Sequence, residues 1–196
     1  MGAFIAYLYL TGRSRHFMVL APNLTIYEKL KSDFRPDSPK YVFRGIAEFA
    51  QLPPLIVTGE NYEQGEATRH DLFADETRPH INIFNISKLT STENRAGAIR
   101  TRTARIRRLQ ECIGESYFDF LAGLDDLVVL MDEAHRYRAS AGAQTLAELR
   151  PRLGLELTAT PKTIGARPKA FRNVVYAYTL GAAIRDGLVK IPAVAT

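Results

Sequence analysis

Two acidic side chains directly follow a short apolar run in the second half of the chain. The run Leu127–Met131 is typical of a strand buried on both faces, and Asp132-Glu133-Ala134-His135 comes next. A carboxylate at the carboxyl end of a parallel strand lies where such sheets bind ligands. Asp132 could hold a magnesium ion that bridges the outer phosphates of a nucleotide. Glu133 could polarise the attacking water, and His135 could contact a neighbouring segment.

A second polar segment follows one helix later. Leu153–Leu157 has the pattern of another strand and ends in Thr158-Ala159-Thr160-Pro161. Hydroxyl side chains at a strand end can hydrogen-bond an acidic loop beside them, and such a contact can couple phosphate loss to movement of a bound strand. Taken alone, Asp132–His135 could be an acidic turn without a function, and Thr158–Pro161 could be an ordinary turn at the end of a strand. Their occurrence together favours the chemical interpretation.

The elements that must position these residues alternate along the chain. Short apolar segments alternate with longer amphipathic ones, which predicts an α/β domain with a mostly parallel sheet. Residues 35–53 and 59–80 are rich in proline, glycine and charge, and are expected to be mostly loop. The predicted strands are His16–Ala21, Pro54–Thr58, Ile81–Ile86, Leu127–Met131, Leu153–Leu157 and Asn173–Tyr178. The predicted helices are Met1–Thr11, Pro22–Phe34, Glu115–Ala122, Ala143–Arg150 and Leu180–Asp186.

The composition fits one domain of ordinary size. The chain has 196 residues, of which 46% are hydrophobic and 24% charged, so a disordered chain is not expected. The formal net charge of +5 suits a polyanionic partner without requiring one. A single cysteine, Cys112, excludes an internal disulfide and favours a reducing, intracellular setting. The apolar N-terminal segment is too short to cross a bilayer.

The pairing of Asp132–His135 with Thr158–Pro161 resembles motifs II and III of superfamily 2 helicases and translocases, the DEAD/DEAH-box motors. The sequence segments that flank the two motifs resemble the Res subunit of type III restriction enzymes more specifically. This resemblance extends over nearly the full length of the chain. The resemblance implies an α/β, RecA-like (P-loop NTPase-type) three-layer lobe over residues 1–188. Residues 189–196 would then begin a linker to a second lobe. The flanking segments are Val19–Thr25, Ile83–Lys88, Asp126–Tyr137 and Tyr178–Lys190.

The resemblance also implies roles for the residues of the two motifs. Asp132 would coordinate magnesium, and Glu133 would be the catalytic base of hydrolysis. His135, Thr158 and Thr160 would couple the state of the nucleotide to the grip on nucleic acid. These assignments agree with the chemistry that the residue types allow.

Two further segments match motifs that lie along the nucleic-acid backbone in the family. Hydroxyl, amide and helix-start N–H groups suit phosphate oxygens, so their chemistry agrees with that role. A simple helix start is the alternative for the first segment. The matching residues are Pro22, Asn23 and Thr25 in the first segment and Asn85, Ser87 and Lys88 in the second.

The family also uses a phosphate-binding loop, Gly-x-x-x-x-Gly-Lys-Ser/Thr, and no such run occurs in the 196 residues. In the family this loop precedes the helix that Met1–Thr11 resembles, so the lobe is expected to be N-terminally truncated. Because the loop supplies most charge-assisted hydrogen bonds to the phosphates, the chain is expected neither to bind ATP tightly nor to hydrolyse it. The loop-bearing strand is internal in such sheets, so a gap with exposed strand edges and self-association are also expected.

Two functions remain open on these grounds. The first is a fragment of an ATP-dependent DNA translocase of a restriction system, contributing the magnesium and hydrolysis motif and part of the DNA track. The second is a catalytically inactive lobe that binds only nucleic acid or a subunit. The resemblance implies Mg²⁺ and ATP as cofactors of the parent protein, double-stranded DNA and a modification subunit as partners, and a cytoplasmic location. A nucleotide-binding domain unrelated to helicases is disfavoured by the paired motifs.

A basic stretch runs from Arg95 to Gln110, with six arginines and no acidic residue. Apolar residues recur in it near a helical spacing, so one face could pack while arginines line the other. Contact with DNA phosphates is one interpretation. A solvated basic helix is slightly favoured, because no aromatic residues interleave for base stacking. The histidines His16, His70 and His80 lie apart from acidic clusters, so no metal site is predicted there.

Overall fold

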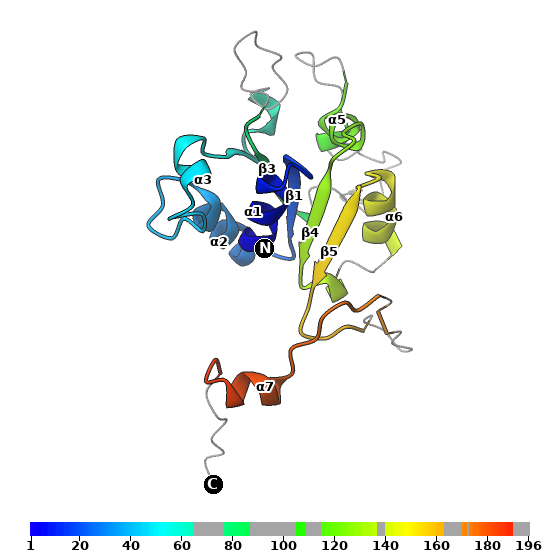
Figure 1. The fold of residues 1–196 in the computed structure, drawn as a ribbon. Coiled ribbons are helices and arrows are strands. Elements are labelled where there is room, and N and C mark those ends of the chain that lie inside the picture. Colours follow the sequence, from blue (N-terminus) through cyan, green and yellow to red (C-terminus); the bar gives the residue numbers. More distant parts are fainter. Residues whose placement is uncertain are drawn as a thin grey trace.

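The computed structural model describes residues 1–64, 77–86, 105–108, 115–136, 140–162, 170–171 and 173–189. Five strands form one parallel sheet in the order β2-β3-β1-β4-β5 (Figure 1). The predicted α/β class with a parallel sheet is therefore confirmed. The strands are β1 (His16–Ala21), β2 (Leu55–Thr58), β3 (His80–Asn85), β4 (Val128–Asp132) and β5 (Leu153–Leu157).

Helices cover both faces of the sheet and complete three layers. One face carries α1 (Gly2–Leu10), α2 (Leu24–Phe34) and α3 (Ala47–Gln51). The other carries α5 (Tyr117–Ala122) and α6 (Ser140–Glu148), and α7 (Leu180–Arg185) lies apart from the sheet (Figure 1). Short 3₁₀ turns occupy Tyr62–Gln64, Arg105–Arg107 and Ala134–Arg136.

The central strand β1 shows why the sheet needs both helical layers. Successive side chains of a strand point to opposite faces. Phe17 and Val19 pack with the layer of α1 and α2, whereas Met18 and Leu20 pack with the layer of α5. All six residues of β1 are buried, as expected for a parallel strand covered on both sides.

Two buried polar side chains, Tyr117 and Asn82, connect helix α5 to the sheet. The Tyr117 hydroxyl of α5 donates to Asn82 Oδ1 at 2.5 Å, and Asn82 Nδ2 donates to the Phe17 carbonyl at 3.0 Å. Burial raises the pKa of Tyr117, so its hydroxyl keeps the proton that it donates. Buried polar groups must be paired, and these bonds tie α5 to β3 and β1.

The prediction that Asn173–Tyr178 forms a strand is wrong. The segment is irregular, and Val175 and Tyr176 are 88% and 77% exposed. The Tyr176 and Tyr178 rings stack on one another at 6.4 Å, and the Tyr178 hydroxyl donates to Asp186. Alternating apolar residues predict a strand only where a neighbouring strand pairs with them, and none of the described strands does so here.

Residues 35–53 are mostly loop, as predicted, and the short helix α3 interrupts them. Phe49 of α3 is fully buried and stacks on Phe43, with ring centroids 4.1 Å apart. Proline and glycine mark the ends of such a short helix, but aromatic burial outweighs them in its interior. The strands predicted at His16–Ala21 and Leu153–Leu157 are confirmed with the same bounds, and the other predicted helices and strands are present with shifted ends.

The expected gap inside the sheet is also wrong for the five described strands. β1 pairs with β3 and β4, and β4 pairs with β5, so neighbouring strands follow one another without interruption. The outer strands are β2 and β5, and Leu153 of β5 is 42% exposed. Within the described ranges, no helix is both long and apolar enough to cross a membrane.

Candidate functional site

The predicted site residues gather along one border of the sheet. All strands run parallel, so their C-terminal ends form one border, here called the carboxyl edge, and their N-terminal ends form the amino edge. Leu20 of β1 pairs with Met131 of β4, and Asp132 pairs with Leu157 of β5. The segment after β4 therefore lies between the segments that follow β1 and β5. The parallel register alone brings the acidic and hydroxyl motifs together.

Asp132 and Glu133 form a sharp turn where β4 ends. Asp132 is half-buried as the last residue of the strand, and its Oδ1 accepts the Glu133 backbone N–H at 3.1 Å. Glu133 has φ of 50°, a left-handed conformation that is uncommon for residues other than glycine. Its side chain is 42% exposed. Backbones of this kind cluster at functional sites, where the surrounding structure holds them.

His135 links the acidic turn to the end of β5. Its Nδ1 lies 2.9 Å from Thr158 Oγ1, 3.3 Å from Thr160 Oγ1 and 3.3 Å from Glu133 Oε2. Thr158 Oγ1 also accepts the Thr160 backbone N–H and donates to the Thr160 carbonyl. Since that hydroxyl proton is already engaged, the network assigns Nδ1–H of His135 as the donor to Thr158. Two separate loops are joined through one imidazole.

The donor set suits a magnesium ion shared with phosphates better than a metal held by protein alone. Among the described residues, no group of three or more His, Cys, Asp or Glu side chains could hold a metal ion. Magnesium is commonly held by one or two carboxylates, with water and phosphate oxygens completing its shell. Asp132 and Glu133 supply that number of carboxylates at the carboxyl edge. The residues present therefore fit a magnesium–nucleotide complex.

The segment after β1 lies beside this turn and begins α2. Asn23 is exposed, and its Oδ1 accepts the Ile26 N–H at 2.9 Å, so it caps the helix. Thr25 is exposed in the first turn, and Pro22 is half-buried. The capping bond uses the amide oxygen of Asn23, and no described residue engages its NH₂ group. Both the helix-start interpretation and the backbone-contact interpretation are compatible with this geometry.

The second predicted backbone segment is described only in part. Asn85 ends β3 beside Ala21, and its side chain is 6% exposed. A nucleic acid would not reach that side chain in this conformation. Ser87 and Lys88 lie outside the described residues.

The basic stretch is described only at residues 105–108, where Arg105–Arg107 forms a 3₁₀ turn. Ile106 is buried. The Arg107 guanidinium lies 3.8 Å from the centre of the Phe118 ring and donates to Glu148 at 2.6 Å. Arg107 is therefore a packing residue between α5 and α6, whereas Arg108 is exposed. The remaining arginines from Arg95 to Arg102 lie outside the described residues.

Sequence reasoning missed a polar cluster at the amino edge. Asp126 Oδ2 accepts the Arg15 backbone N–H at 2.8 Å, its Oδ1 lies 2.5 Å from His16 Nδ1, and its carbonyl accepts from Ser14 Oγ at 2.7 Å. His16 is thus not isolated from acidic groups. Burial would raise the pKa of Asp126, but the bonds from His16 and Arg15 outweigh it and hold that pKa below its usual range. The partners are far apart along the chain, so no local pattern marks them.

His80 stands next to this cluster. Its ring lies 5.1 Å from that of His16, edge to face. Burial, together with nearby His16, Arg15 and Arg78, lowers the pKa of His80 to about 4. His80 is therefore neutral near pH 7, and protonating it would place a charge in a poorly solvated position.

The model of the family "Type III restriction enzyme, res subunit" matches residues 1–163, which include both motifs at the carboxyl edge. Its RecA-like fold agrees with the three layers and the parallel sheet. Searches of curated proteins and of solved structures gave no match.

Proposed function

Since the chain belongs to the type III restriction enzyme res-subunit family, of DEAD/DEAH-like helicase domains, we propose that its carboxyl edge is half of an ATP site. A bound magnesium ion would neutralise charge on the outer phosphates. Asp132 would hold that ion at the end of β4, and the carboxylate of Glu133 would orient the attacking water and accept its proton. The observation that carries this proposal is the pair of carboxylates in a left-handed turn, bonded through His135 to the end of β5.

The His135 network gives the site a means of reporting its state. A change of charge beside Glu133 alters the attraction between its carboxylate and His135 Nδ1, at 3.3 Å. His135 then changes its bond to Thr158, and Thr158 in turn holds the Thr160 backbone. The segment after β5 is thus mechanically connected to the acidic turn. Coupling of this kind needs two discrete arrangements of one element, and the exchange of His135 between Glu133 and the two threonines supplies them.

We further propose that Pro22, Asn23 and Thr25 form part of a DNA track, with residues 1–188 as the first motor domain and residues 189–196 as the start of a linker. The start of α2 presents backbone N–H groups and an amide side chain, which suit phosphate oxygens. Ser87 and Lys88, which follow β3, complete the proposed track, whereas the buried Asn85 would support the end of β3 without touching the DNA. Duplex DNA and a modification subunit are the proposed partners.

Calorimetry with Mg²⁺ and ATP tests the nucleotide half of the proposal. The 196 residues contain no Gly-x-x-x-x-Gly-Lys-Ser/Thr run, so most of the contacts that hold a triphosphate are lacking. We expect no saturable binding in the low micromolar range and no turnover above that of Glu133→Gln. Saturable low-micromolar binding, or turnover that Glu133→Gln removes, would contradict the expected weakness of the isolated chain.

The alternative function is a catalytically inactive module that binds only nucleic acid or a subunit. Anisotropy with labelled duplex DNA addresses the shared part of both functions. Asn23→Asp keeps the helix cap while adding a negative charge, so it should weaken DNA binding several-fold. Gln51→Glu makes the same chemical change on exposed α3 and serves as the matched control. Equal affinities of the two variants would remove Asn23 from the DNA track.

A further inference from the structure

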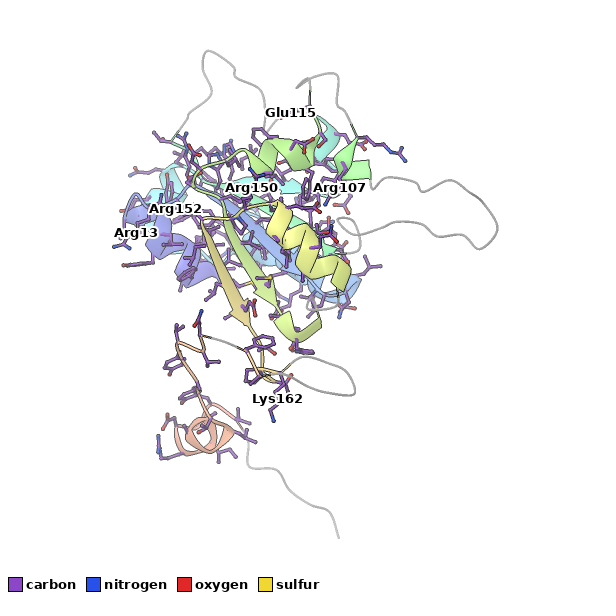
Figure 2. All side chains as sticks on the ribbon, turned by 90° about the vertical axis from the view of Figure 1, so that its right-hand side faces the viewer. Arg13, Arg107, Glu115, Arg150, Arg152 and Lys162 are labelled. Atoms are coloured by element: carbon purple, nitrogen blue, oxygen red, sulfur yellow. The ribbon has the colours of Figure 1, made fainter. Side chains whose placement is uncertain are left out.

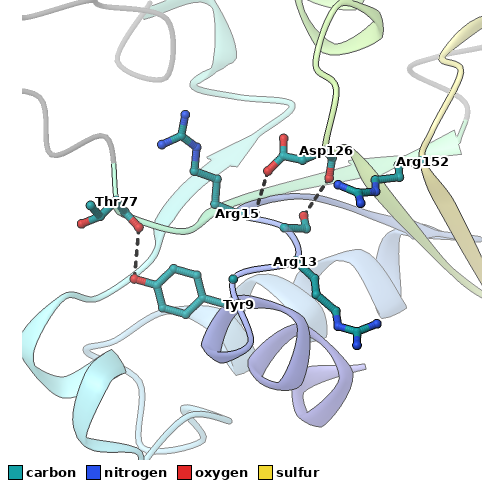
Figure 3. A pocket seen from close by; sticks show the side chains of 8 residues that line it. Tyr9, Arg13, Arg15, Thr77, Asp126 and Arg152 are labelled. Carbon is teal, nitrogen blue, oxygen red and sulfur yellow. Dashed lines mark hydrogen bonds between the residues drawn. The ribbon is translucent and has the colours of Figure 1, made fainter.

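A cavity of about 330 Å³ opens at the amino edge, at the opposite border of the sheet from Asp132 (Figure 3). It belongs to none of the residues assigned to nucleotide or DNA above. The turn between α1 and β1 forms one wall, and the starts of β4 and β5 form another. The residues that line it are Tyr9, Gly12, Arg13, Ser14, Arg15, Thr77, Asp126 and Arg152.

Hydrogen bonds of the main chain build the walls of this cavity. Gly12 has φ of 65°, which glycine adopts without strain, and the Arg13 N–H donates to the Leu8 carbonyl at 2.9 Å. On the other wall, the Arg152 N–H donates to the Leu127 carbonyl at 2.8 Å. The Ser14 bond to the Asp126 carbonyl then joins the two walls. The backbone of Arg13 and that of Arg152 are therefore each held in place by main-chain hydrogen bonds.

The charge lining the cavity is predominantly positive. Arg13, Arg15 and Arg152 contribute three guanidiniums against the single carboxylate of Asp126. Both oxygens of that carboxylate already face donors of the protein, Arg15 N–H and His16 Nδ1. Among the described residues, no carboxylate lies within 4.0 Å of the guanidinium of Arg13 or Arg152.

The arginines that line the cavity come from separate parts of the chain. Figure 2 shows Arg13 and Arg152 near the start of β5 and Lys162 beyond its end. In Figure 3, Arg152 points toward Asp126, while Arg13 and Arg15 extend to either side of the turn. On the rim, the Tyr9 hydroxyl donates to the Thr77 carbonyl at 3.1 Å. Hydroxyl groups thus stand beside the arginines at the cavity mouth.

We propose that this cavity is an anion site that binds a phosphate group, with the guanidinium of Arg152 facing it and Arg13 and Arg15 adding positive charge on either side. Arginine is the side chain best suited to phosphate, because its planar donors match the oxygens in pairs. The volume lies near the lower limit of small-molecule sites, roughly 300 Å³. It accommodates one phosphate or pyrophosphate with part of its carrier. A peptide helix or strand would not enter it, which favours phosphate over the carboxylates of an acidic protein.

Titration with inorganic pyrophosphate in magnesium-free buffer tests the site on the full chain. Omitting magnesium removes the metal-dependent contribution of Asp132 at the other edge, so failure here is distinguishable from failure of the proposed ATP site. We expect saturable binding that Arg152→Gln weakens about tenfold, since each charge-assisted hydrogen bond contributes about that factor. Arg13→Gln should weaken it less.

The matched control is Arg150→Gln, which removes an exposed arginine near Arg152 that does not line the cavity. It should change the affinity less than twofold. Unfolding curves and amide spectra of each variant verify that the fold is kept. Absence of saturable binding, or an equal loss in Arg150→Gln, would overturn the proposal by reducing the effect to general charge.

Two further binding experiments distinguish a phosphate group of nucleic acid from that of a free phosphorylated ligand. If Arg152→Gln weakens binding of a 5′-phosphorylated duplex and pyrophosphate competes with that duplex, the source is nucleic acid. If Arg152→Gln weakens pyrophosphate alone, the source is a free phosphorylated ligand. A polyglutamate peptide that binds as tightly as pyrophosphate, with the same dependence on Arg152, would overturn the assignment to phosphate.

Discussion

The two edges of the sheet use polar residues in opposite ways. At the carboxyl edge, Glu133 is exposed and His135 divides its contacts among three oxygens at 2.9 to 3.3 Å. At the amino edge, Asp126 is held by short bonds from residues more than a hundred positions away. A side chain that contacts several partners, such as His135, can change from one to another. A side chain with short bonds to fixed partners, such as Asp126, instead stabilises one arrangement of the turns around it. The same parallel sheet thus has one edge suited to changing state and one suited to keeping its shape.

This difference has a physical origin in the connections of the fold. Turns that follow a strand at the carboxyl edge carry the motifs directly, and His135 joins two of these turns that the parallel register already places side by side. The amino edge is closed by turns from distant segments, and a side chain there must bridge them. Stability should therefore depend on Asp126, and chemistry on Asp132 and Glu133.

The largest effect on folding is expected for Asp126→Ala. Loss of its carboxylate leaves the Arg15 N–H and His16 without an acceptor, which should lower the free energy of unfolding by about 2–3 kcal/mol. Asp125→Ala removes a neighbouring exposed carboxylate and should cost less than about 0.5 kcal/mol. Urea unfolding of both variants measures the difference. Similar midpoints would contradict the fixed role of Asp126.

The second prediction is that His80 makes the free energy of unfolding depend on pH in the acidic range. His80 has a folded pKa of about 4 against 6.5 for the ordinary group, so the unfolded chain binds more protons between these values. Stability is then fully present above about pH 6.5 and falls as the pH drops toward 4, by about 1.4 kcal/mol for each pH unit over most of that range. In His80→Asn this part of the profile should flatten. Urea unfolding at a series of pH values tests it, and an unchanged slope in the variant would exclude His80 as the cause.

A smaller effect is expected for Thr158→Val at the carboxyl edge. Valine keeps the shape but removes the bonds to His135 and to the Thr160 main chain, at a cost of about 1 kcal/mol. Thr160→Val removes only the 3.3 Å contact with His135 and is the matched control, with a smaller loss expected. Thermal unfolding ranks the two variants. The reverse order would show that Thr158 does not organise the edge.

The smallest effect is expected for Glu133→Gln. Its side chain is exposed and its only described ionic contact is with His135, so the free energy of unfolding should change by less than about 0.5 kcal/mol. The imidazole resonances of His135 should nevertheless shift in the NMR spectrum. A large loss of stability would mean that Glu133 fastens the edge in the way that Asp126 does.

The sequence predicts the carboxyl edge better than the amino edge. Five apolar runs identify the five strands of the sheet, and their parallel order brings Asp132 and Thr158 together without knowledge of any side-chain contact. Asn173–Tyr178 has the same alternation but finds no described partner strand, and a pattern cannot reveal that. Asp126 and Arg152 have ordinary loop neighbours in the sequence. Asp126 and Arg152 lie close to the Gly12–Arg15 turn only because the tertiary fold brings these distant segments together.

Amide NMR with millimolar Mg²⁺ and ATP tests most directly whether the carboxyl edge is half of an ATP site. We predict shifts in Asp132–His135 and Thr158–Thr160 that vanish when magnesium is chelated and in Asp132→Asn. Any shifts of Arg13 and Arg152 should survive chelation, because guanidiniums bind phosphate without a metal. Carboxyl-edge shifts that are absent, or that persist without magnesium, would contradict the account.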